Sequence, residues 1–229
     1  MAIGSPTRRV ASRQVLADHV YDELMIAFVD GRLEADQPLN IDALARDLEV
    51  SQTPIREALA RLESTGLVIR AALKGYRVAP LFSSDEIVEL MDARDVLEPE
   101  NAFRACARSS EDLVQRLQVT ITDLDRSLSE DDGTGISPYW QADERFHRLV
   151  AEAAGNRFLL AAYNALGGQV QRFRLFGGIG VSDAGSAIAE HGTILEAFRA
   201  GDPDAARAQM HAHIEGVRTR AVADTHRAR

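Results

Sequence analysis

The chain has 229 residues, of which 45% are apolar and 27% charged; this composition supports one large or two smaller folded domains and excludes disorder throughout. No run of 18 uncharged apolar residues occurs, so the sequence predicts neither a transmembrane helix nor a membrane partner. A single cysteine, Cys106, excludes an intramolecular disulfide and a cysteine-cluster zinc finger, and it indicates a cytoplasmic protein.

The distribution of charge is more informative than its total. A net charge of −9 argues weakly against an anionic partner such as nucleic acid. However, residues 51–80 carry five basic and two acidic side chains, whereas residues 81–229 carry 16 basic and 24 acidic ones. A small basic region ahead of an acidic body is typical of a DNA-binding domain joined to a domain that does not contact DNA.

The N-terminal third of the chain has the pattern of a winged helix-turn-helix domain, predicted over residues 12–80 behind a disordered tail at 1–11. Ser51 is a favourable N-cap for the third helix, and Pro54 suits its first turn. Apolar spacing and turn signals predict three helices and then a β-hairpin, at 12–30, 41–48, 52–64 and 67–79.

The third of these helices is the candidate DNA-reading element, because a helix of its width fits the major groove. The side opposite its apolar face presents Gln52, Thr53 and Arg56. At the hairpin tip, Lys74 and Gly75 are placed to approach a phosphate or the minor groove. The alternative is that these charges are ordinary solvated side chains.

After a linker at 80–83 no strand signal appears, and the sequence predicts an all-helical domain over residues 84–222. The overall fold class is therefore mainly α, an N-terminal winged helix-turn-helix followed by a C-terminal bundle of six helices. These six helices are expected at 84–108, 110–128, 138–153, 157–176, 184–200 and 203–222.

Several polar residues fall on the apolar stripes of these helices. Asp143 and His147 are one turn apart on the same stripe, and His191 and His213 occupy the stripes of two later helices. Buried without partners, these groups would cost several kcal/mol, on the order of the desolvation penalty of a polar group. A shared divalent cation satisfies all four; zinc is expected first, with manganese, nickel or iron as alternatives. Each histidine taken singly is equally explained as a hydrogen-bonded core residue.

Arg94 also lies on an inward stripe, and a buried guanidinium needs an anion. A small carboxylate that binds the metal and pairs with Arg94 meets both needs, so Arg94 is the candidate ligand-binding residue. Periodicity does not decide whether Arg172 and Arg174 face the same pocket.

These features resemble a known family. The runs LEVSQTPIREAL at 48–59, RLESTGLV at 61–68 and KGYRV at 74–78 look like the winged helix of GntR-superfamily transcription regulators. The runs RDVLE at 94–98, DERFH at 143–147 and MHAH at 210–213 resemble the all-helical FCD effector domain of the FadR-like branch. The likeness extends from about residue 12 to residue 222.

The resemblance implies a homodimeric regulator that binds a double-stranded DNA operator and responds to a small anionic metabolite. It places metal ligation on Asp143, His147, His191 and His213, and DNA contacts on Thr53, Arg56 and Gly75. Gln52 departs from the usual arginine, so a shifted operator sequence and a weaker salt dependence are expected.

Two other functions remain open at this point. One is a DNA-binding regulator whose metal is purely structural. The other is a metal-dependent hydrolase, which is disfavoured because no inward carboxylate besides Asp143 is evident as a general base and because an enzyme does not need a winged helix.

Overall fold

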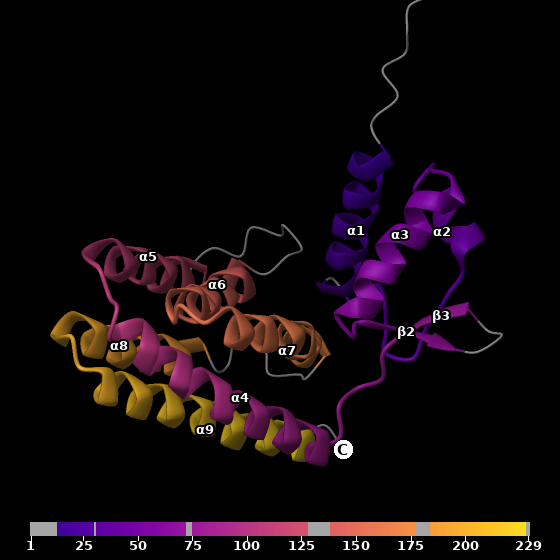
Figure 1. The fold of residues 1–229 in the computed structure, drawn as a ribbon. Helices are drawn as coiled ribbons and strands as arrows, with labels where there is room; N and C mark the ends of the chain where they lie inside the picture. The colour runs from indigo at the N-terminus through magenta and orange to yellow at the C-terminus, as the bar shows by residue number, and fades with distance from the viewer. Residues whose placement is uncertain (1–12, 30, 72–74, 128–137, 177–183, 228–229) are drawn as a thin grey trace, which may run out of the picture.

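A computed structural model of the chain describes residues 13–29, 31–71, 75–127, 138–176 and 184–227. The tail expected at 1–11 lies outside these residues. Within them the chain is mainly helical and forms an N-terminal part of helices and a small sheet and a C-terminal part of helices (Figure 1). The predicted fold class is therefore confirmed.

The N-terminal part contains the three predicted helices, which are α1 (Arg13–Val29), α2 (Ile41–Asp47) and α3 (Gln52–Ser64). The chain then forms the predicted hairpin, with β2 (Val68–Ala71) antiparallel to β3 (Gly75–Val78).

One strand was not predicted. β1 (Pro38–Leu39) pairs with β3 and gives a sheet of order β1-β3-β2, although the sequence ahead of Pro38 reads as a polar turn. Two residues are too few to show strand alternation, and Leu39 pairs because its side chain is buried in the core beside the sheet.

Helix α3 buries one face and exposes the other. Ile55, Leu59 and Leu62 are 0% exposed and pack against α1. Each such burial contributes about 1.5–3 kcal/mol. Gly66 follows the helix with a φ of 76°, which residues with side chains rarely adopt, and turns the chain into β2. The solvent-facing side of α3 is thereby held in a fixed position.

The C-terminal part contains the six predicted helices among its described residues. Helix α4 starts at a capping box in which the Ser83 side chain accepts from the Glu86 amide and Glu86 accepts from Ser83, as the sequence predicted. The six helices are α4 (Ser84–Cys106), α5 (Glu111–Ser127), α6 (Pro138–Ala153), α7 (Arg157–Phe176), α8 (Ala184–Ala200) and α9 (Pro203–Arg227).

Helix α9 continues past its predicted end at residue 222 and ends at Arg227. Its Val217 and Ala221 belong to the same apolar cluster as Ile87 of α4. Helices α4 and α9 lie side by side, and α5 packs against α6 and α8 (Figure 1). Their apolar core, built around Phe146, surrounds the polar residues that the sequence singled out. In the described residues no helix is long and apolar enough to span a membrane.

Candidate metal centre and DNA-binding surface

Three imidazoles from three helices meet in the C-terminal core. His147 of α6, His191 of α8 and His213 of α9 are 2%, 0% and 1% exposed. One ring nitrogen of each lies within 4.8 Å of one in each of the others. Nε2 of His147 is 3.2 Å from Nε2 of His191. The inward stripes of the three helices therefore converge on one point.

Asp143 completes this group. It lies one turn before His147 on α6 and is 3% exposed. Its Oδ1 is 3.7 Å from Nε2 of His191 and 4.0 Å from Nε2 of His147. The four residues that the sequence selected for a cation are thus neighbours in space.

The chemistry and spacing of these donors fit a divalent cation. Imidazole nitrogen and carboxylate oxygen are ligands that zinc, manganese, nickel and iron accept. Adjacent donors on one zinc ion, each at 2.0–2.1 Å, lie roughly 3.0–3.4 Å apart. The separations of 3.2, 3.7 and 4.0 Å among Asp143, His147 and His191 are close to that range. The ring nitrogen of His213 lies within 4.8 Å of those of the other two histidines, so the donors must contract around the ion to reach bonding distance.

Two further carboxylates orient the histidines from behind. Oε2 of Glu98 lies 2.6 Å from Nδ1 of His147, and Oε2 of Glu190 lies 2.8 Å from Nδ1 of His213. A proton on Nδ1 of His213 donated to Glu190 leaves the Nε2 lone pair for a metal, which is the usual arrangement around ligating histidines, whereas Glu98 is in ion-pair contact with His147. The sequence analysis missed both residues. Glu98 was detectable, because it follows Arg94 by one helical turn on the same face.

Arg94 and Glu98 form a buried ion pair on α4. The two residues are 1% and 4% exposed, and Nε of Arg94 is 2.5 Å from Oε1 of Glu98. Burial raises the pKa of Glu98, but Arg94 and His147 outweigh burial and hold that pKa well below its ordinary value. The anion that Arg94 needs is therefore supplied within the chain.

The Arg94–Glu98 pair bears on two expectations from the sequence, the need of Arg94 for an external anion and the supply of inward carboxylates. A bound acid is not required to neutralise Arg94, although Nη1 of Arg94 has no acceptor in the described residues beyond the sulfur of Met91, 3.8 Å away. A second buried carboxylate, Glu98, lies in the core besides Asp143, and the sequence did not identify it. Glu98 is nevertheless engaged by Arg94 and His147, so it is not a free general base.

Two other polar residues are buried in this region. Asn101, one turn beyond Glu98 on α4, is 1% exposed, and neither of its amide atoms has a hydrogen-bond partner among the residues described. Such a group costs about 1–3 kcal/mol unless water or a ligand satisfies it. Tyr163 of α7 is also buried; burial first and the charge of Glu98 second raise its pKa well above the ordinary value, so its phenol stays protonated.

The predicted DNA-binding residues that the structure describes are all exposed. Gln52, Thr53 and Arg56 are exposed at the start of α3, opposite its buried face. Nε2 of Gln52 donates to Oδ1 of Asp42 at 2.5 Å, and Nη2 of Arg56 donates to Oε1 of Gln52 at 3.3 Å. Gly75 is exposed at the start of β3 with a φ of 82°, and Lys74 lies outside the described residues.

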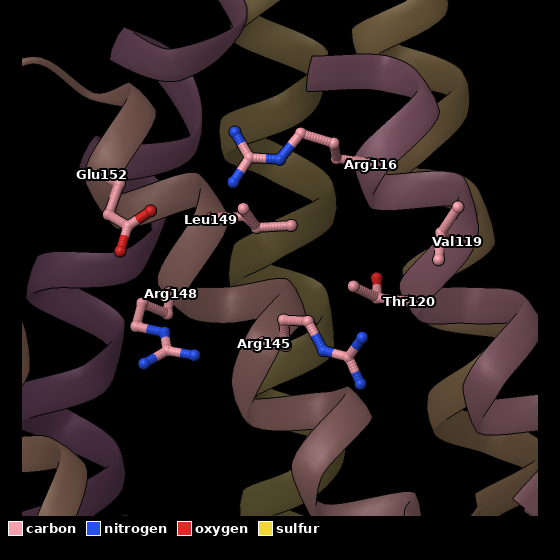
Figure 2. A pocket seen from close by; sticks show the side chains of 7 residues that line it. All are labelled: Arg116, Val119, Thr120, Arg145, Arg148, Leu149 and Glu152. Atoms are coloured by element: carbon pink, nitrogen blue, oxygen red, sulfur yellow. The ribbon is translucent and has the colours of Figure 1, made fainter. Parts of the chain in front are cut away.

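A separate cleft of about 370 Å³ lies between α5 and α6 and contains none of the predicted site residues (Figure 2). Its three arginines each have an acidic neighbour: Arg145 is 3.2 Å from Asp123, Arg148 is 3.5 Å from Glu144 and Arg116 is 3.8 Å from Asp112. Because these charges are already balanced at the surface, the cleft gives no indication of an anion site.

Comparison with known proteins yields two family matches that together span most of the chain. Residues 16–78 match the bacterial regulatory proteins of the gntR family, and residues 89–216 match the FCD domain. A Paenarthrobacter nicotinovorans protein named as a probable D-xylose utilization operon transcriptional repressor is 30% identical over 210 residues, covering 91% of this chain and 89% of its own. An Escherichia coli (strain K12) protein, provisionally named an L-lactate dehydrogenase operon regulatory protein, is 28% identical over 227 residues, covering 89% and 85%.

Solved structures share the fold. The McbR/YncC protein of E. coli superposes with a TM-score of 0.72 at 20% identity, covering 90% of this chain and 96% of its own. The metal-free FCD domain of TM0439 superposes with a TM-score of 0.50 at 20% identity, covering 63% of this chain and 97% of its own. The similar proteins are transcriptional regulators rather than enzymes.

Proposed function

This chain belongs to the GntR family of bacterial regulatory proteins and carries an FCD domain, and we propose that a divalent metal and a small anionic metabolite bound in its C-terminal domain set its affinity for a DNA operator. The chain is a DNA-binding transcriptional regulator of this type. The single observation that supports the metal-dependent part is the convergence of Asp143 and three histidines in the core.

In this proposal Asp143, His147, His191 and His213 hold the ion. Zinc is the first candidate, with manganese, nickel or iron as alternatives. An ion that accepts five or six ligands would leave coordination positions that a carboxylate could fill. Glu98 and Glu190 support the proposal, because they fix two of the imidazoles in the orientation that a metal requires.

The effector class follows from the groups around the metal. Nη1 of Arg94 is left over after Glu98 has taken the other nitrogens, and the amide of Asn101 lacks a partner among the described residues. A small carboxylate with a second polar group satisfies both. One relative is named for an L-lactate dehydrogenase operon, and lactate is a small carboxylate of this class.

DNA recognition is assigned to Gln52, Thr53 and Arg56 in the major groove and to Lys74 and Gly75 at the wing. We expect a homodimer on a palindromic operator, with half-sites about 34 Å apart, so that two α3 helices enter successive major grooves on one side of the duplex. Gln52 pairs best with adenine and carries no charge, so contacts at this position favour adenine over guanine.

The test uses an operator selected from random duplexes, with affinity measured by fluorescence anisotropy on the zinc-loaded protein across a panel of small mono- and dicarboxylates. At least one acid is expected to change affinity by about fivefold or more. The response is expected to disappear in His213→Ala and to persist in His211→Ala, because His211 is exposed on the same helix.

The outcome separates this proposal from the alternative of a purely structural metal. If the zinc-loaded protein binds its operator equally well with every acid in the panel, the metal stabilises the fold without sensing a ligand. If His213→Ala and His211→Ala respond alike, the metal is not part of the effector site. A hydrolase is not proposed, since Glu98 is already held by Arg94 and His147.

A further inference from the structure

Helix α7 passes so close to the end of α3 that glycine is required at position 168. A Cβ added to Gly168 would lie 2.6 Å from the carbonyl carbon of Thr65, and closer still to its carbonyl oxygen and Cα. Carbon atoms in contact stay about 3.5–4.0 Å apart. Any side chain at this position therefore forces two backbones to separate. Thr65 is the C-cap of α3, so the contact joins the C-terminal part directly to the DNA-reading helix.

A second close contact joins the same two segments, between Gly66 after α3 and Gln169 of α7. A Cβ added to Gly66 would lie 2.8 Å from Cδ of Gln169, so the side chain of Gln169 fills the space above Gly66. The two glycines lie in different parts of the chain. The absence of a side chain at Gly168 leaves room for Thr65, and its absence at Gly66 leaves room for Gln169. Such close-packed backbone contacts transmit displacement rather than absorb it.

Arg172, one turn further along α7, ties the same helix to the linker. Its Nε and Nη2 both donate to the carbonyl oxygen of Pro80, at 3.2 Å and 2.7 Å. Its guanidinium also lies over the ring of Phe82, 3.8 Å from the centroid. Arg172 is 9% exposed. The linker is therefore held at a defined point on α7.

The other half of α7 reaches the surroundings of the metal centre. Helix α7 packs against α4 and α6, the helices that carry Glu98 and His147, and its Tyr163 is buried. Gly168 follows Tyr163 by five residues, about 7.5 Å at 1.5 Å per residue. Figure 1 shows α7 running from the C-terminal helices toward the N-terminal part.

We propose that Gly168, Gln169 and Arg172, packed against Thr65, Gly66 and Pro80, form an interdomain clasp that fixes the DNA-binding domain on α7 and carries the state of the metal centre to α3. The mechanical part of this inference stands on the contacts alone, whereas the coupling to the metal rests on the proposed function. Because packed elements shift between discrete arrangements, a displacement of α7 at Tyr163 moves Gly168, and with it the end of α3.

A matched pair of substitutions tests the clasp. Gly168→Ala introduces the clash with Thr65, whereas a Cβ added to Gly167 meets nothing within 4 Å. Both changes raise helix propensity by the same amount, so their difference reports the contact alone. The readout is hydrogen exchange of residues 61–71 in the metal-free, full-length protein. Exchange is expected to be about tenfold faster in Gly168→Ala than in Gly167→Ala, as overpacking of this kind implies.

A second variant guards against a folding defect. Arg172→Gln removes the bonds to Pro80 without a clash and is expected to accelerate exchange in residues 61–71 in the same direction. Unchanged exchange in α6 and α9 shows that each variant is folded. Equal exchange of residues 61–71 in Gly168→Ala and Gly167→Ala, with Arg172→Gln like wild type, overturns the clasp.

Adding zinc ions alone then tests the coupling. In wild type and Gly167→Ala, zinc is expected to slow exchange in α6, α8 and α9 and also to change exchange in residues 61–71. Gly168→Ala is expected to keep the first effect and lose the second. A response of residues 61–71 that is the same in all three proteins, or absent from wild type despite protection of α6, α8 and α9, refutes the coupling. If zinc protects none of these helices, the metal centre itself is wrong, and the metal-free comparison still decides the clasp.

Discussion

Replacing Glu98 by glutamine removes a negative charge that is buried between Arg94 and His147. Glu98 is 4% exposed, and its Oε1 is 2.5 Å from Nε of Arg94, whose side chain is 1% exposed. The substitution leaves a guanidinium in the core with no carboxylate. Removing one partner of a buried ion pair costs about 3–5 kcal/mol. Glutamine keeps one accepting oxygen, so we expect the lower end, about 3 kcal/mol of unfolding free energy.

Urea unfolding of the metal-free protein measures this loss, and Glu100→Gln is the matched control. Glu100 lies two residues further along α4 and pairs with Arg104 and Arg207 at the surface, so its replacement is expected to cost about 0–1 kcal/mol. Glu98→Gln is also expected to weaken zinc binding by roughly 10- to 100-fold, because it removes the negative charge beside Nδ1 of His147. Equal stability of the two variants would refute the assignment of Arg94 and Glu98 as a buried charge pair.

Three further predictions concern the DNA-binding surface, the start of α4 and the core of α3. Gln52→Arg is expected to shift the preferred operator base toward guanine, which operator selection measures, and to steepen the salt dependence of binding, which a salt titration measures. An unchanged preferred site counts against a base contact at this position. Glu86→Gln is expected to cost about 0.5 kcal/mol at neutral pH. The backbone and side-chain hydrogen bonds from Ser83 lower the pKa of Glu86 below 4.5, so the stability that Glu86 provides is present above that pH and is lost as the pH falls below it. Thermal unfolding of wild type and Glu86→Gln should therefore give melting temperatures that differ at neutral pH and converge in acid. A difference that stays constant with pH contradicts the capping role. Leu59→Ala is expected to cost about 2–5 kcal/mol in urea unfolding, whereas Leu81→Ala, at a position 56% exposed, changes little; similar losses would contradict the assigned core.

The helices were predictable because their apolar residues recur at helical spacing, and several have a clear start signal. The capping box at Ser83 fixed the start of α4, and the proline after Asp202 fixed the start of α9. Strand β1 was not predictable from its own residues, since pairing with β3 and burial of Leu39 are tertiary effects. The end of α9 was predicted five residues too early, because residues 223–227 are mostly polar and carry no apolar stripe.

The candidate metal ligands were predictable for the same reason as the helices. Asp143 and His147 interrupt an apolar stripe, and a polar residue in such a position needs a partner. Glu98 was missed because its partner Arg94 was expected to bind an external anion. The clasp could not be predicted from the sequence, since no motif around Gly168 indicates that the backbone of Thr65 packs against it.

X-ray absorption spectroscopy of the zinc-loaded protein addresses the metal centre most directly, because it reports the ligands of the ion itself. The proposed site predicts one zinc per chain, bound by three imidazole nitrogens and carboxylate oxygen at about 2.0–2.2 Å. In His213→Ala the imidazole signal should fall by one third, while His211→Ala leaves it unchanged. A zinc ion surrounded by oxygen alone, or a spectrum that is the same in both variants, would contradict the site.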